Sequence, residues 1–140
     1  MSARTLLVVD DDDEIREIVG LALEVMGGWT VLSADRGAAG LKLAREHRPD
    51  VVLLDVMMPE MDGPTMFSRM QVDPALRDIP VVLLTAKVQV GHVQVWDSLP
   101  VAGVIPKPFN PATLSDEIDQ LVAEHRRTAG AGGSEHQQTA

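Results

Sequence analysis

The chain has 140 residues, 45% of them hydrophobic and only 3% aromatic, which is enough aliphatic material for one core. Its formal net charge is -9, with 12 Lys and Arg against 21 Asp and Glu, so direct binding to DNA or RNA is not expected. The sequence contains no Cys, no secretory signal and no apolar run of membrane-spanning length, and therefore predicts a soluble, cytoplasmic protein without disulfides.

The first half of the chain contains two units in which a short aliphatic run precedes a segment with helical spacing. The run 5–9 precedes a helix predicted over 13–26, after which two consecutive glycines provide a stop. The run 29–34 precedes a helix predicted over 36–48, which Pro49 ends. Most of these runs lack polar alternation, which is typical of strands that are buried on both faces.

The second half repeats the same order three times. The predicted strands cover 50–54, 79–84 and 101–105, and the predicted helices cover 64–72, 88–98 and 111–127. Apolar and polar residues alternate in the segment 88–98 as they do in a strand, so its assignment as a helix rests on the regular strand–helix order of the other units.

Regular alternation of strands and helices favours an α/β fold in which helices cover both faces of a parallel sheet. We expect this single domain to occupy 1–127. The remaining segment 128–140, "TAGAGGSEHQQTA", has small and polar residues without an apolar period, so it is predicted to be a disordered tail.

Polar residues stand at the ends of four of the predicted strands. Asp10 and Asp11 follow the first strand, Asp55 the third and Thr85 the fourth, while Lys107 lies just after the fifth. Because the carboxyl ends of parallel strands meet at one edge of a sheet, these side chains should converge there. Any one of them could simply cap a helix or start a turn, but five at the same edge favour a functional site.

Three carboxylates at one edge repel one another, and a hard divalent cation among them would relieve that repulsion. Mg²⁺ prefers oxygen ligands, so Asp11 and Asp55 are the best direct ligands, with Asp10 acting through water. Mg²⁺, a lysine and a hydroxyl are a recurrent set for stabilising a phosphoryl group. The chain has no Cys and no Ser-His-Asp pattern, so the available nucleophile is a carboxylate, as in aspartyl-phosphate chemistry.

These motifs resemble those of the receiver domain of two-component response regulators, over roughly residues 4–125. The matching stretches are "LLVVDDD", "DVVLLDVMMPEMDG", "VVLLTA" and "KPF". The resemblance implies a flavodoxin-like fold with a five-stranded sheet of order 2-1-3-4-5 and five helices. It also implies a cis Lys107–Pro108 bond and a loop after Asp55 that Pro59 and Gly63 shape.

The resemblance further implies the roles of the site residues. Asp55 would accept a phosphoryl group from a histidine kinase or a histidine phosphotransfer protein. Thr85 would hydrogen-bond that group and Lys107 would pair with it. The metal site for Mg²⁺ would comprise Asp10, Asp11, Asp55 and the backbone carbonyl of Met57.

A receiver of this kind acts by binding other proteins, so we expect an unknown downstream protein partner, no enzyme activity beyond self-phosphorylation and self-dephosphorylation, and a monomer or weak dimer. The chain departs from the family at Val104, where an aromatic residue is usual, and at Pro106. Both departures concern the output of the switch rather than the phosphorylation chemistry.

Two alternatives stay open at this level. The chain could be a docking module that takes no phosphate, although its complete set of Asp, Thr and Lys argues against this. It could also be a Mg²⁺-dependent phosphatase with an aspartyl-phosphate intermediate. Such enzymes usually carry D-x-D on the first strand beneath a cap domain, whereas this chain has "DVM" at Asp55.

Overall fold

The computed structural model describes residues 4–86 and 98–139 of the chain, with side chains described as far as residue 128. It contains a five-stranded parallel sheet of order β2-β1-β3-β4-β5, which confirms the predicted strand order. The strands are β1 Thr5–Val9, β2 Thr30–Ala34, β3 Val51–Asp55, β4 Val81–Thr85 and β5 Gly103–Pro106. The described helices are α1 Asp13–Gly27, α2 Gly37–His47, α3 Gly63–Gln71 and α4 Leu114–Thr139.

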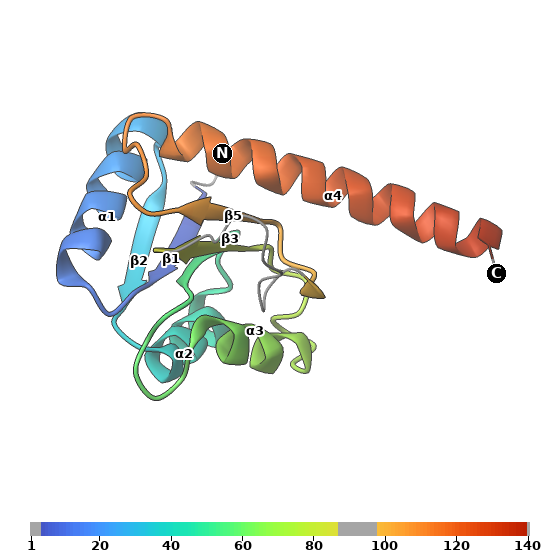
Figure 1. Cartoon of the computed structure of the whole chain (residues 1–140), viewed down its shortest axis with the longest axis horizontal. Helices are drawn as coiled ribbons and strands as arrows, with labels where there is room; N and C mark the ends of the chain where they lie inside the picture. Colours follow the sequence, from blue (N-terminus) through green and yellow to red (C-terminus); the bar gives the residue numbers. More distant parts are fainter. Residues whose placement is uncertain (1–3, 87–97, 140) are drawn as a thin grey trace.

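The helices cover the sheet from both sides, as Figure 1 shows, with α1 and α4 on one face and α2 and α3 on the other. Successive side chains of a strand point to opposite faces of the sheet, so each inner strand contributes side chains to the hydrophobic core on both faces. In β1, Leu7 and Val9 pack toward α2 and α3, whereas Leu6 and Val8 pack toward α1 and α4. This explains why the strands read as unbroken aliphatic runs rather than as alternating patterns.

The strand β3 is central, with β1 and β4 as its hydrogen-bonded neighbours, and all five of its residues are buried. The register places Val9 beside Leu54 and Asp55 beside Leu84, so the carboxyl ends of these strands lie level with one another. Pairing of β3 with its two neighbours therefore fixes the position of Asp55 at the carboxyl edge of the sheet.

The ends of α1 follow from local chemistry. The Asp12 carboxylate accepts hydrogen bonds from the backbone N–H groups of Glu14 and Ile15 and so caps the helix. Gly28 follows the helix with a φ of 65°, a left-handed conformation that glycine adopts without steric cost.

Two of the predicted segments, 88–98 and 128–140, lie wholly or partly outside the regular elements that carry the site. The helix predicted over 88–98, with Trp96, lies almost entirely outside the described residues. The disordered tail predicted over 128–140 stays a prediction, and in the structure α4 continues to Thr139 and projects beyond the sheet (Figure 1). A helix satisfies its own backbone hydrogen bonds, so it can continue without the apolar period that the sequence argument required.

Candidate functional site

Four polar residues converge at the carboxyl edge of the sheet. Asp10 directly follows β1, Asp55 and Thr85 are the last residues of β3 and β4, and Lys107 directly follows β5. The side chains of Asp10, Asp55 and Thr85 are buried, and buried carboxylates such as those of Asp10 and Asp55 ordinarily require a partner of opposite charge. The carboxyl edge of the sheet therefore holds a cluster of polar side chains next to the aliphatic core.

Lys107 links the two buried carboxylates. Its Nζ lies 2.8 Å from Oδ2 of Asp10 and 3.2 Å from Oδ1 of Asp55. The lysine itself is held by its backbone, whose N–H donates to the Thr85 carbonyl over 2.7 Å. The peptide bond that joins it to Pro108 is cis, as predicted. The ammonium group thus has a defined position between two acids.

Asp11 completes a group of three carboxylates. One oxygen each from Asp10, Asp11 and Asp55 lies within 4.8 Å of the others, while Asp11 itself is exposed to solvent. This arrangement of hard oxygen donors, two buried and one exposed, fits a small divalent cation that keeps part of its water shell. The single ammonium of Lys107 leaves these three negative charges incompletely balanced, which also favours a cation.

The electrostatics of Asp55 reflect this crowding. Burial raises the pKa of its carboxyl from 3.8 to about 6, and the charge of Asp10 acts in the same direction. Lys107 and a hydrogen bond from the Met57 backbone oppose the rise in this pKa. Burial alone would lower the pKa of Lys107, but the hydrogen bond and charge of Asp10, and then those of Asp55, raise it.

Hydrogen bonds to both its side chain and its backbone fix the position of Asp10. Its Oδ1 accepts the backbone N–H of Asp12 over 2.9 Å, and its own N–H donates to the Ala34 carbonyl of β2 over 3.1 Å. One guanidinium nitrogen of Arg16, in the first turns of α1, donates to its backbone carbonyl over 2.6 Å. The contribution of Arg16 was not anticipated from the sequence, because a bond from a side chain to a backbone carbonyl has no residue-type signature.

The loop after β3 passes very close to the strand end. A Cβ atom on Gly63 would lie 2.5 Å from the backbone oxygen of Asp55, a contact that real Cβ atoms do not make. The Gly63 N–H also donates to the Val56 carbonyl over 2.9 Å, and the Asp62 side chain caps α3. The structure therefore explains the predicted importance of Gly63 by close approach. Met57 lies in the same loop, and its proposed carbonyl role toward a metal stays a prediction.

The two departures from the usual family pattern lie on β5. Val104 is partly buried, pairs with Leu83 and packs against the core beneath α2 and α3. Pro106 stands beside Thr85 in the register. Both positions are thus adjacent to β4, the strand that carries Thr85.

A comparison with protein families matches the model described as "Response regulator receiver domain" over residues 6–119 of the chain. The chain belongs to this family. The matched residues include every one of the converging residues, from Asp10 to Lys107. This membership confirms the resemblance that the motifs indicated.

Curated relatives support the same assignment. The phosphate regulon transcriptional regulatory protein PhoB of Pseudomonas aeruginosa is 36% identical over 135 residues, which cover 96% of this chain and 57% of that protein. The DNA-binding dual master transcriptional regulator RpaA of Synechocystis is 39% identical over 124 residues, covering 88% of this chain and 49% of that protein. The chain therefore spans about half the length of these relatives.

Solved structures agree with the fold. The chemotaxis response regulator CheY4 of Vibrio cholerae superposes with a TM-score of 0.78 at 29% identity, covering 86% of this chain and 99% of that one. A putative response regulator from Chloroflexus aurantiacus gives a TM-score of 0.79 at 30% identity, covering 87% and 99%. Among the residues that the structure describes, no helix combines the length and apolarity needed to cross a membrane.

Proposed function

We propose that this receiver domain accepts a phosphoryl group on Asp55 and uses the resulting charge to switch its binding to another protein. The observation that carries the proposal is the position of Asp55 at the end of a fully buried strand, with the Lys107 ammonium 3.2 Å from its Oδ1. This transfer requires at least a nucleophilic carboxylate and a nearby cation that stabilises the negative charge developing during the reaction.

In the proposed step, a carboxylate oxygen of Asp55 attacks the phosphorus of a phosphohistidine on a kinase or phosphotransfer protein. The new O–P bond forms as the P–N bond breaks, and the electron pair of that bond stays on the imidazole nitrogen. Lys107 holds positive charge at the acceptor carboxylate throughout. Because the pKa of Asp55 is about 6, the carboxylate is mostly ionised at neutral pH and able to attack.

We further propose that Asp10, Asp11, Asp55 and the Met57 carbonyl hold Mg²⁺. The three carboxylates have the donor chemistry and spacing for it. When bound, the ion would neutralise phosphoryl oxygens during transfer. Asp10 would then have two roles, since it also orients the Lys107 ammonium by accepting its hydrogen bond.

Thr85 is the proposed sensor of the phosphoryl group. It is buried at the end of β4, and its carbonyl accepts the backbone N–H of Lys107. A phosphoryl group adds about 1.5 to 2 negative charges at pH 7, together with strong acceptor oxygens for a hydroxyl. The signal would pass from Thr85 to the adjacent β5, where Val104 offers an aliphatic side chain, and then to a cytoplasmic protein partner.

We place the end of the receiver unit near residue 127. The last described side chain of α4 that is buried in the core is Val122, and the family model ends at residue 119. We expect no activity from this unit beyond its own phosphorylation and dephosphorylation.

The test is incubation with Mg²⁺ and acetyl phosphate, followed by intact mass measurement. We expect one base-labile phosphoryl adduct that requires Mg²⁺, is absent from Asp55→Asn and is retained in Asp78→Asn, a control at an exposed carboxylate. An adduct that persists in Asp55→Asn would refute the assignment of the acceptor. If no adduct forms, release of inorganic phosphate distinguishes a short-lived aspartyl phosphate from a docking-only domain.

A further inference from the structure

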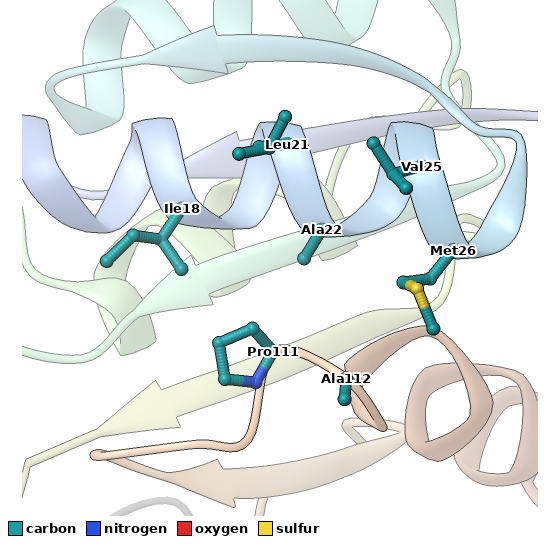
Figure 2. A pocket seen from close by; sticks show the side chains of 7 residues that line it. All are labelled: Ile18, Leu21, Ala22, Val25, Met26, Pro111 and Ala112. Atoms are coloured by element: carbon teal, nitrogen blue, oxygen red, sulfur yellow. The ribbon is translucent and has the colours of Figure 1, made fainter.

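A hollow beside α1 and a hollow at the amino edge of the sheet differ in their chemistry. The described residues that line the first are apolar, among them Leu21 and Val25 (Figure 2). Small-molecule sites combine apolar walls with a few polar groups that orient the ligand, and the first hollow lacks such groups among these residues. The second hollow is lined by apolar and charged residues together. The second hollow therefore has the chemistry of a small-molecule site.

The second hollow lies where β4 begins. It is lined by residues of α3, of the segment that leads into β4 and of α4. Its volume is about 330 Å³, at the lower end of the range for small-molecule sites. Val81, in its wall, and Thr85, at the acidic site, are the first and last residues of β4 and lie about 13 Å apart along the strand. The second hollow and the acidic site are therefore at opposite edges of the sheet.

Buried apolar residues form the fixed part of the second hollow. Phe67 and Val81 line it and belong to the core between the sheet and α3. The backbone of Arg77 is also held in place. Its N–H donates to the Asp73 carbonyl over 2.9 Å, and its carbonyl accepts a hydrogen bond from Nε2 of Gln71 over 3.4 Å. The hollow is therefore shaped by the fold itself.

Basic side chains gather around this apolar wall. Arg77, His125 and Arg126 line the hollow, and none of their side chains has an ion pair or hydrogen bond with another residue that the structure describes. Asp78 is the one acid among the described lining residues. The chain has 21 Asp and Glu against 12 Lys and Arg, so two unpaired arginines at one hollow are unexpected. This surplus of positive charge favours an anionic ligand.

The acids nearest to Arg126 on its other side already have partners. Arg126 also borders a neighbouring hollow that contains Asp50 and Asp119. Asp119 pairs with Arg4 over 2.5 Å, and the Asp50 carboxylate accepts the backbone N–H of Thr5 over 2.8 Å. The guanidinium of Arg126 therefore stays available to a ligand.

We propose that the hollow at the start of β4 binds a small phosphate monoester that carries a compact apolar group. Guanidinium groups pair with phosphate through parallel N–H···O hydrogen bonds, and the two charges of a monoester match Arg77 and Arg126. The apolar group would pack against Phe67. This inference goes beyond the phosphoryl chemistry and is independent of it, since none of the residues that form the hollow belongs to the acidic site.

The test uses phenyl phosphate as the probe, with the full chain in a chelator. Without Mg²⁺, neither metal-bound phosphate nor transfer to Asp55 can contribute to the signal. Binding is followed by ¹⁵N chemical-shift changes, which should be saturable, centre on Val81 and Arg126 and give a Kd of about 1 mM or lower. Phenol and inorganic phosphate each carry half of the chemistry of the probe and should bind about tenfold more weakly.

Variants of the chain make the test specific. Arg126→Gln and Arg77→Gln should each lose about tenfold in affinity for phenyl phosphate. Arg127→Gln is the matched control, because it changes the net charge equally at an adjacent exposed position outside the hollow, and its affinity should stay within about twofold. Asp78→Asn should strengthen binding about twofold or more, since it removes a repulsive charge. All four positions are exposed, so the variants should fold.

Four results would overturn the proposal. The first is an absence of saturable binding, and the second is equal affinity for phenol and phenyl phosphate, since no anion would then be recognised. The third is an equal loss of affinity in Arg127→Gln and Arg126→Gln, which would mean that net charge rather than the hollow decides binding. The fourth is a set of shifts centred on Lys107, which would place the anion at the acidic site.

Discussion

The Lys107 ammonium lies closer to Asp10, at 2.8 Å, than to Asp55, at 3.2 Å. The proposed acceptor therefore shares its counter-charge with a neighbour that is buried more completely. Asp10 consequently influences Asp55 in two ways, by direct repulsion and by engaging the lysine.

This relationship predicts the effect of Asp10→Asn in the metal-free protein. The substitution removes the Asp10 charge and leaves Lys107 free to pair with Asp55, so the pKa of the Asp55 carboxyl should fall from about 6 toward its ordinary value. The measurement is a carboxyl ¹³C NMR titration in the presence of a chelator. Asp11→Asn, at the exposed member of the cluster, should lower that pKa less. An unchanged pKa in Asp10→Asn would mean that burial alone sets it.

The pH dependence of stability follows from the same carboxyl. Its pKa is raised in the folded state, so between about pH 3.8 and 6 the folded chain binds more protons than the unfolded chain. Unfolding free energy should therefore decrease as pH rises through this window, by on the order of 2 kcal/mol from this group. Asp55→Asn should remove that decrease and stabilise the metal-free protein at pH 7.5. Urea unfolding at several pH values tests this, and a variant as pH-sensitive as the parent would contradict it.

Removal of the ammonium should have the opposite consequence. Lys107→Met leaves two buried carboxylates without a cation, so we expect a loss of about 3 kcal/mol at pH 7.5 in a chelator. Mg²⁺ should restore part of this stability if the carboxylates bind it. Lys42→Met, at an exposed lysine of α2, is the control and should change the unfolding free energy little. Equal effects of the two substitutions in urea unfolding would argue against the ion pairs.

Close approach predicts a difference between two glycines. Gly63→Ala should destabilise the protein by about 1–3 kcal/mol and slow phosphorylation, because its Cβ would force the loop away from the Asp55 backbone oxygen. Gly20→Ala, in α1 with no atom within 4 Å of the added Cβ, should instead stabilise by about 0.5–1 kcal/mol. Thermal unfolding and the acetyl phosphate assay measure both. A similar loss of stability in both variants would contradict the steric explanation.

Local patterns in the sequence were sufficient to predict the strands, the described helices and most of the residues of the site. The aliphatic run before Asp55 identifies a strand buried on both faces, and Asp12 has the residue type of a helix cap at the start of α1. Both features can be read from the sequence because the spacing of apolar residues and helix capping depend only on residues close together in the chain. Parallel strands end at one edge, so the convergence of Asp10, Asp55 and Lys107 could be predicted without coordinates.

Only the tertiary structure decided what depends on distances between elements. The unequal sharing of Lys107 between two acids and the hydrogen bond from Arg16 to the Asp10 carbonyl depend on how β5 pairs with β4 and how α1 packs on the sheet. The same packing leaves Leu21 uncovered, although its residue type and helical spacing equally suit a core position. Residue type and period determine which side chains share a face, and the arrangement of neighbouring elements determines whether anything covers that face.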